Sequence, residues 1–395
     1  MGQGGAAGVT LNLLEVSGQI SAMAAGLRER RQELWRSLEL ARALLARWSG
    51  AAELGFLREG ALAGQGDHLQ AEPLQPLGYT RVAPTPPTGY AVVGTDGSQI
   101  DLDRHSLAPC YLINVGSAVI TYGGEPAASL TSWGRLHYSD DDLYTGEGDS
   151  RVAVQGSLLD LRRTLAEQER ALALCAGQPE SGAPLVALMD GTLVLWRFSG
   201  REAERAAPIL RAYQEGLRRF QSMGVPVCSY ISRPAARDVL NLLAWMAQAE
   251  GSVPRRYTPA DLEGFAGLAD RMLFEGLRRG ERSALLASQA PSADEERSQR
   301  IHFFYLNVGD EVARVEAPAW VVEQPELLDT VHAVVAEQCR LGWGYPVALS
   351  EAHEQAVIRG GEREAFLRMV GSALNDHGLA AALSAKRLSK NRRAV

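Results

Sequence analysis

Hydrophobic and charged positions alternate with helical spacing along the first part of the chain. Between residues 11 and 58, leucines and tryptophans recur every three or four positions, charged residues fill the intervals, and proline is absent. This spacing places the apolar side chains on one face of an amphipathic helix. The pattern predicts a helical arm over residues 1–64, which either contacts a partner molecule or packs on the body of the protein.

The helical pattern stops at a stretch that is rich in proline and glycine. Residues 65–90 contain five prolines, at positions 73, 76, 84, 86 and 87. Proline lacks a backbone N–H donor and disfavours both helix interiors and central strands. We therefore expect residues 65–90 to be a linker between the arm and a main domain that spans residues 91–380.

Short apolar segments and amphipathic helices follow in a defined order. The predicted elements are strands at 91–95, 108–122 and 129–138, a helix at 151–176, a strand at 185–190, a helix at 200–222 and a strand at 225–231. Three antiparallel strands followed by helix–strand units match the ribonuclease H-like topology. The sequence thus predicts an α/β protein with an RNase H-like mixed sheet flanked by helices, an added N-terminal helical arm and C-terminal helices.

The last third of the chain adds further helices and one hairpin. Helices are predicted at 234–250, 259–288, 325–340 and 363–377, and a β-hairpin joins 301–308 to 313–315. The final residues, 381–395, carry five lysine and arginine side chains. They form a predicted basic tail that can contact a polyanion.

Composition narrows the class of protein. The chain has 395 residues, of which 46% are hydrophobic, enough for one large domain or two smaller ones. No apolar run approaches the ~18–20 residues of a membrane span, and the first residues lack a secretory signal pattern, so we expect a cytoplasmic protein without a membrane partner. Its four cysteines are far apart, which argues against a zinc site or a disulfide framework. The net charge of −7 gives no global sign of nucleic-acid binding, although a local basic channel is enough for it.

Two predicted strands lead into the same short polar motif. The motifs are Asp96-Gly97-Ser98 and Asp190-Gly191-Thr192. Asp-Gly is also ordinary turn chemistry, so a plain turn is the alternative interpretation of each copy, and we expect Gly97 to turn the chain sharply. A carboxylate at the tip of a buried strand is costly to desolvate unless a cation, hydrogen bonds or water compensates. In the RNase H-like topology these two strands are neighbours, so Asp96 and Asp190 should lie side by side.

The helix between these strands offers a third carboxylate. Glu167 and Glu169 both lie on it, and Glu169 falls on the apolar stripe between Leu165 and Leu172. Helical phase therefore favours Glu169 as the inward residue, although Glu167 stays a candidate and either could be a solvated surface residue. Three carboxylates around one point repel each other strongly unless cations are bound. Oxygen ligands select hard ions such as Mn²⁺ or Mg²⁺, and one or two of them can promote phosphodiester cleavage.

Two late residues complete the set of candidates. Tyr345 precedes Pro346, and His353 follows a short apolar run eight residues later. A phenol can orient a phosphate, and a neutral imidazole can bind a metal or take a proton near neutral pH. The alternative for His353 is a structural histidine that supports the helix after it.

Taken together, these motifs resemble the NurA nuclease family. The matching pieces are Gly94-Thr95-Asp96-Gly97-Ser98, Leu188-Met189-Asp190-Gly191-Thr192-Leu193, Tyr230-Ile231-Ser232-Arg233-Pro234, and Gly344-Tyr345-Pro346 with Glu351-Ala352-His353-Glu354. Their order is more specific than any one of them. The resemblance covers residues ~90–370, most of the chain.

The resemblance implies an activity, a cofactor and partners. It implies a manganese-dependent DNA nuclease with 5′ to 3′ exonuclease and single-strand endonuclease activities that acts in resection of double-strand break ends. It further implies a homodimer that docks on the hexameric ATPase HerA. The family's catalytic positions then fall on Asp96, a helix glutamate (Glu167 or Glu169), Asp190, Tyr345 and His353, of which Asp96, the glutamate, Asp190 and His353 would bind the metal.

Two other classes of function remain open at the level of sequence. Asp-Gly-Ser and Asp-Gly-Thr are similar to the phosphate loops of actin-like sugar kinases and ATPases, which share the core topology. That alternative needs a late glycine-rich adenosine motif, and the only late glycine pair, Gly360-Gly361, lies in a charged helical context. The other alternative is a non-catalytic DNA clamp or motor adaptor with structural carboxylates. The chain has no Gly-x-x-x-x-Gly-Lys motif, so ATP hydrolysis would belong to a partner.

Overall fold

The computed structural model describes residues 12–63, 70–101, 109–146, 151–178, 182–195, 200–249, 264–289 and 297–379. The predicted basic tail, 381–395, and the first eleven residues of the predicted arm lie outside the described residues. Within the described ranges, none of the helices combines the length and apolar character needed to cross a bilayer.

The described elements follow one another along the chain as helices and strands of very different lengths. The helices are α1 (Leu13–Arg47), α2 (Leu54–Ala63), α3 (Asp140–Leu143), α4 (Ser157–Ala176), α5 (Gly200–Ser222), α6 (Asp238–Ala249), α8 (Ala319–Val322), α9 (Pro325–Leu341), α10 (Val347–Ala356) and α11 (Gly360–Asp376). The strands are β1 (Ala71–Pro73), β2 (Arg81–Val82), β3 (Tyr90–Ile100), β4 (Tyr111–Tyr122), β5 (Ala127–His137), β6 (Tyr144–Thr145), β7 (Val152–Ala153), β8 (Leu185–Asp190), β9 (Val227–Ile231), β10 (Glu281–Arg282), β11 (Leu286–Ser288), β12 (Ile301–Asn307) and β13 (Val312–Pro318).

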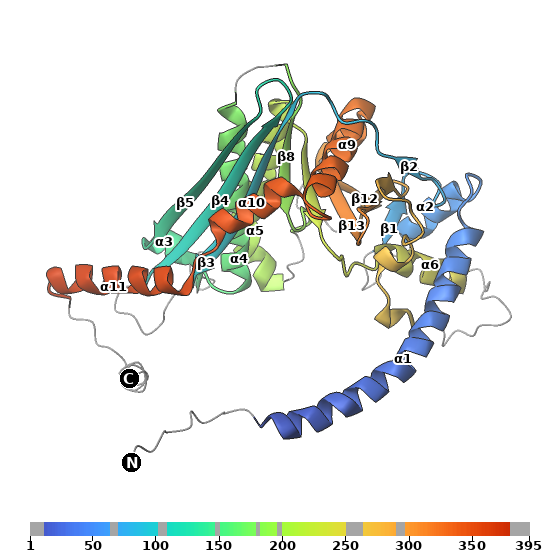
Figure 1. Cartoon of the computed structure of the whole chain (residues 1–395), viewed down its shortest axis with the longest axis horizontal. Helices are drawn as coiled ribbons and strands as arrows, with labels where there is room; N and C mark the ends of the chain where they lie inside the picture. The colour runs from blue at the N-terminus through green and yellow to red at the C-terminus, as the bar shows by residue number, and fades with distance from the viewer. Residues whose placement is uncertain are drawn as a thin grey trace, which may run out of the picture.

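A single large sheet organises the molecule (Figure 1). Its strand order is β5-β4-β3-β8-β9-β13-β12-β11-β1. The antiparallel strands β5, β4 and β3 are followed by β8 and β9, which run parallel to β3. This is the predicted RNase H-like arrangement, and the predicted fold class is confirmed. Strand β13 then pairs antiparallel to β9 and carries the sheet on through β12.

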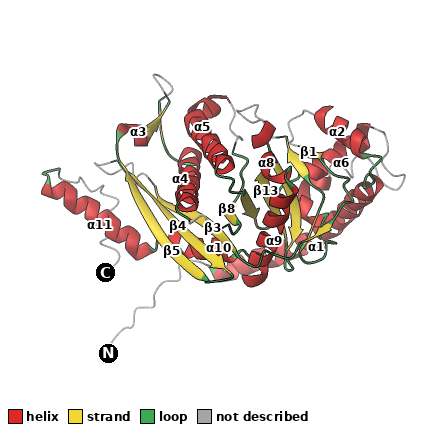
Figure 2. Cartoon of the chain, turned by 90° about the horizontal axis from the view of Figure 1, so that it is seen from above, coloured by secondary structure: helices red, strands yellow, loops and turns green. Residues whose placement is uncertain are grey.

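Helices cover both faces of the RNase H-like part of the sheet. Helices α4 and α5 lie on one face of it, and α10 crosses the other (Figure 2). Contact with α10 is close because glycines face it: a Cβ atom at Gly94 would lie 2.5 Å from the Ala348 carbonyl oxygen, and one at Gly116 would lie 2.1 Å from that of Ala352. These two glycines therefore allow the backbone of α10 to rest directly on β3 and β4.

The predicted arm is partly packed and partly exposed. The second half of α1 buries Leu40, Leu44 and other residues in a core that α2 and α6 share. The first half carries Leu13, Leu14, Ile20 and Met23, all at least half exposed, and extends away from the body (Figure 1). The second half of the helix therefore packs on the body of the protein, whereas contact of the exposed first half with a partner molecule stays a prediction.

Three sequence expectations differ from the structure. Residues 70–90 are not a plain linker, because β1 pairs with β11 and β2 pairs with β10. The predicted helix at 259–288 is wrong: its described part, from residue 264, consists of short 3₁₀ turns followed by β10 and β11, and glycines at 264, 267, 276 and 280 interrupt it. The turn expected at Gly97 is also wrong, because β3 continues to Ile100 and Gly97 pairs with Val115.

Candidate functional site

Asp96 and Asp190 lie on neighbouring parallel strands. The pairing of β3 with β8 includes Thr95 opposite Met189, and the two aspartates follow these residues by one position. Asp190 is the last residue of β8, whereas Asp96 lies inside β3. The Oδ1 atom of Asp96 accepts a hydrogen bond of 2.8 Å from the backbone N–H of Gly97. The two carboxylates predicted from the repeated motif therefore meet at one end of the parallel strands.

Helix α10 brings His353 to Asp96 from one face of the sheet. The Nδ1 atom of His353 lies 2.7 Å from Oδ2 of Asp96, and the histidine side chain is 62% exposed. The end of the helix is fixed on the same strands, because the carbonyl of Ala356 accepts hydrogen bonds from the Ser98 hydroxyl and the Asn114 amide. Ser98 of the Asp-Gly-Ser motif thus anchors the helix that carries His353.

Helix α4 brings Glu167 to the aspartates from the opposite face. Glu167 is buried, with 5% of its surface exposed, and a Cβ atom at position 97 would lie 2.3 Å from its Oε1 atom. Glycine at position 97 therefore provides the space that this carboxylate occupies. Arg163, one turn earlier, places its Nε atom 3.2 Å from the same oxygen.

The orientation expected for Glu169 is wrong. Its side chain is exposed, whereas Glu167 is buried against β3. The leucine stripe alone misplaces the buried face of α4, because α5 also packs on this helix, and a Cβ atom at Gly216 of α5 would lie 2.0 Å from the Gln168 side chain. That shift leaves Glu169 at the outer rim of the face.

The electrostatics of the three carboxylates are unfavourable as they stand. Burial raises the pKa of Glu167 to about 8; Arg163 opposes this shift, and the charges of Asp96 and Asp190 add to it. The pKa of Asp190 is also raised, first by loss of hydration within the protein and then by the negative charge of Asp96. A hydrogen bond from Tyr345 opposes this shift. A group of acids with such raised pKa values is typical of a functional site.

Tyr345 is the fifth predicted residue that lies at the candidate site. Its hydroxyl donates a hydrogen bond of 3.0 Å to Oδ1 of Asp190. Its ring packs edge-on against Tyr230, with the centroids 5.4 Å apart, and the Tyr230 hydroxyl donates to Glu311 and to the Gly344 carbonyl. Burial and the nearby Asp190 charge raise the pKa of Tyr345, so its hydroxyl remains a hydrogen-bond donor at neutral pH.

Glu316 on β13 belongs to the supporting structure and was not predicted. It is 1% exposed, and its Oε2 atom accepts 2.8 Å hydrogen bonds from the Thr192 hydroxyl and the Leu193 N–H. Arg314 donates to its other oxygen at 2.7 Å. Glu316 thus holds the loop that directly follows Asp190, and this explains the threonine of the second motif. No local sequence signal marks it, because it acts across two strands of the sheet.

The donor atoms match a hard divalent cation in chemical type. Carboxylate oxygens are the ligands that Mn²⁺ and Mg²⁺ prefer, and a cation would offset the burial and the repulsion that together raise the pKa of Glu167. Within the described residues, however, no three His, Cys, Asp or Glu side chains are close enough to hold an ion as they stand. Each carboxylate has a protein partner instead: His353 for Asp96, Tyr345 for Asp190 and Arg163 for Glu167. Metal binding would require these side chains to exchange partners.

Comparisons with known proteins assign the family. A comparison with curated proteins finds no match. Among solved structures, LC9-RNase H1, described as a type 1 RNase H with the type 2 active-site motif, matches with 13% identity over 38% of this chain and 67% of that one. Its TM-score of 0.23 is too low to support an argument, so the fold assignment rests on the strand order. The model of the NurA domain matches residues 90–358, which hold all the candidate site residues. The chain belongs to the NurA family.

Proposed function

We propose that the chain is a metal-dependent DNA nuclease whose centre is formed by Asp96, Glu167, Asp190, Tyr345 and His353. Membership of the NurA family supports a nuclease. The observation that carries the proposal is that Glu167 from one face of the sheet and His353 from the other approach the aspartates at one end of β3 and β8. Fold alone could not support it, because the RNase H-like topology hosts many activities.

In this proposal Asp96, Glu167 and Asp190 bind one or two Mn²⁺ or Mg²⁺ ions, with His353 as a further ligand. Bound ions would supply charge neutralisation at the scissile phosphate and an activated water. Tyr345 is placed to orient a phosphate through its hydroxyl, because that hydroxyl already lies at Asp190. His353 is exposed enough to exchange protons with solvent if it acts as the base instead.

The structure disfavours the phosphotransferase alternative. In that class the Asp-Gly-Ser motif must form a loop whose backbone N–H groups cradle a phosphate. Here residues 96–98 lie inside β3 and pair with residues 114–116 of β4. Their backbone is therefore part of the sheet, and position 97 is filled by the Glu167 side chain rather than left open for a phosphate.

Digestion of end-labelled DNA tests the proposed activity. Purified protein should degrade single-stranded DNA and duplex ends with Mn²⁺ and should be inactive in excess chelator. Metal binding has a separate measurement: Mn²⁺ should raise the melting temperature because ligands bind the folded state. If neither substrate is cleaved with Mn²⁺ or Mg²⁺, the nuclease proposal is wrong and the alternative of a non-catalytic DNA clamp or motor adaptor remains. The polarity, 5′ to 3′, and the role in end resection are parts of the proposal that strand-specific labels on resected duplexes address.

Tyr345→Phe and His353→Ala should lower turnover more than DNA affinity. DNA is held mainly by many backbone charge contacts, whereas these side chains lie at the proposed reacting centre. We expect turnover to fall roughly 10²-fold for His353→Ala and by less for Tyr345→Phe, with a Kd within about threefold of wild type. Rates and Kd values should be measured together with melting temperatures. A destabilised His353→Ala variant with full activity per folded molecule would show that the histidine is structural.

The exposed half of α1 is proposed to take part in assembly, either in a homodimer or in docking on a HerA-type hexameric ATPase. Deleting residues 1–24 removes Leu13, Leu14, Ile20 and Met23 but keeps the part of α1 that packs in the core. The truncated protein should melt at the wild-type temperature and lose self-association or ATPase binding in light scattering. An unchanged dimer that still binds the ATPase would exclude this half-helix from both roles.

A further inference from the structure

Two residues near the candidate site hold a backbone conformation that is costly for them. Arg233, after β9, has φ +44°, and Trp343, after α9, has φ +58°. In the part of the chain that the structure describes, they are the non-glycine residues with positive φ. Such backbone strain tends to occur at functional sites.

The two residues are linked to the same small network. The Nε atom of Arg233 lies 3.7 Å from Glu311, which accepts the Tyr230 hydroxyl at 2.9 Å. That hydroxyl also lies 3.2 Å from the carbonyl oxygen of Gly344, the residue after Trp343. Tyr230 packs on Tyr345, which bonds to Asp190. Both strained residues are thus linked through Tyr230 to the tyrosine that contacts Asp190.

Trp343 exposes its indole to solvent from a tightly turned backbone. Its side chain is 92% exposed, the largest exposure among the described large hydrophobic side chains. Its flanks are tight: Gly344 has φ +107°, and a Cβ atom at Gly342 would lie 2.0 Å from the Tyr345 carbonyl oxygen. Only Gly344 separates Trp343 from Tyr345, so their Cα atoms are at most about 7 Å apart. The indole therefore contributes little packing, and its backbone lies close to the tyrosine of the candidate site.

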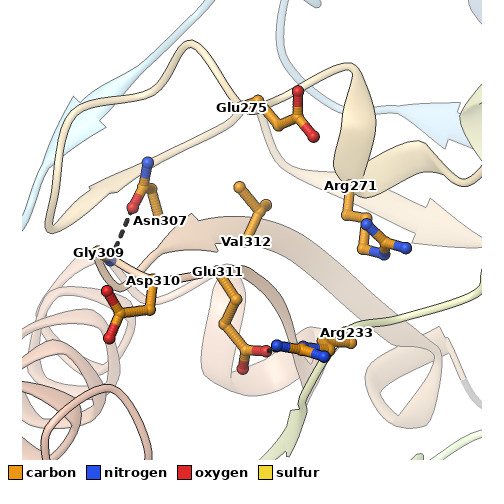
Figure 3. A pocket seen from close by; sticks show the side chains of 8 residues that line it. All are labelled: Arg233, Arg271, Glu275, Asn307, Gly309, Asp310, Glu311 and Val312. Atoms are coloured by element: carbon orange, nitrogen blue, oxygen red, sulfur yellow. Dashed lines mark hydrogen bonds and ion pairs between the residues drawn. The ribbon is translucent and has the colours of Figure 1, made fainter.

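Arg233 lies on the wall of a neighbouring pocket. The pocket, of about 330 Å³, is lined by Arg233, Arg271 and Glu275 and by the turn between β12 and β13, which includes Asp310 and Glu311 (Figure 3). The Arg233 side chain is 81% exposed, and Glu311 already accepts hydrogen bonds from Tyr230 and Ser232. The guanidinium of Arg233 therefore lies at this pocket with most of its surface open to solvent.

We propose that Trp343 and Arg233 form a binding site for an unpaired nucleotide of the DNA strand, in which Trp343 stacks on the base and Arg233 contacts the phosphate. This inference rests on the proposed nuclease function, because it places the nucleotide beside the strand end that is cut. Aromatic stacking accepts every base, and arginine matches phosphate geometry. The site therefore selects single-stranded over paired DNA without reading sequence.

Binding of fluorescein-labelled oligothymidylate in excess chelator tests the site without any cleavage. Because base–aromatic stacking is worth ~1–3 kcal/mol, Trp343→Gly should weaken binding roughly 5- to 150-fold, and Trp343→Phe should weaken it much less. An oligomer with abasic residues should bind wild type and Trp343→Gly equally. Trp133→Phe, which alters an indole that is 39% exposed on β5, serves as the matched control and should bind like wild type.

Arg233→Gly has a separate signature. Loss of one phosphate contact should reduce the slope of log K against log salt by about 0.7, whereas Trp343→Gly should leave this slope unchanged. Glycine adopts positive φ without strain, so both glycine variants should melt at or above the wild-type temperature. Wild-type affinity of Trp343→Gly, an equal loss on abasic DNA, or a clear fall in melting temperature would each overturn the proposal. Failure of the nuclease proposal would appear instead as absent cleavage with Mn²⁺ while this binding pattern remains.

Discussion

Asp96→Ala should abolish DNA cleavage while leaving the protein folded. Asp96 is the carboxylate at which the other parts of the site meet: its Oδ2 contacts His353, and its charge raises the pKa of both Glu167 and Asp190. Removing it takes away a proposed metal ligand and the anchor of the histidine together. We expect the rate to fall roughly a thousandfold or more, comparable with loss of a central catalytic group.

Stability should respond to Asp96→Ala in the opposite direction. Without metal, the variant loses a repulsive neighbour of two other carboxylates, so its melting temperature should equal or exceed that of wild type. The stabilisation by Mn²⁺ should disappear with the activity. Asp101→Ala, at an exposed aspartate just after β3, is a matched control that should keep both properties. Cleavage by Asp96→Ala near the wild-type rate would remove the strand β3 carboxylate from the mechanism.

Local sequence patterns predicted the elements that depend on local physics. Apolar strands and amphipathic helices gave the order of β3 to β9, and this order places Asp96 beside Asp190. The short motifs around Tyr345 and His353 identified two further residues, and these lie beside Asp190 and Asp96 in the structure. Their catalytic roles remain predictions.

Other features depend on contacts that no local pattern encodes. The inward position of Glu167 follows from the packing of α4 on β3 and from the space at Gly97. A turn was expected at Gly97 because Asp-Gly usually forms one. In the structure Gly97 lies inside a strand, and its missing side chain leaves room for Glu167. Glu316 reaches the loop after Asp190 only because β9 and β13 pair. The short strands in the proline-rich segment likewise form only against β10 and β11.

The second prediction with a large expected effect compares the same substitution at the two glutamates of α4. Glu167→Gln should reduce cleavage roughly 10²-fold or more, because it removes a buried carboxylate that interacts electrostatically with the two aspartates. Glu169→Gln should retain nearly full activity, because that side chain is exposed to solvent. The pair is a matched control: both variants make the same chemical change two residues apart on one helix. Equal and undiminished activity of both would show that the acidic centre does not include α4.

The pH dependence of stability gives Glu167 a signature that does not require activity. In the metal-free folded protein its pKa is raised from 4.5 to about 8, so the folded state keeps a proton that the unfolded chain has released. Stability must then fall as pH rises from about 4.5 to 8, since the unfolded state binds fewer protons over that range. Glu167→Gln removes this dependence. The two proteins should unfold alike in denaturant at pH 4, and the variant should become more stable than wild type by a few kcal/mol at pH 8, because each pKa unit corresponds to about 1.4 kcal/mol. Saturating Mn²⁺ should reverse the order at pH 8, since the ion stabilises the ionised carboxylate that only wild type has. A constant stability difference between the two proteins at all pH values would show that Glu167 is ionised normally and does not share a centre with the aspartates.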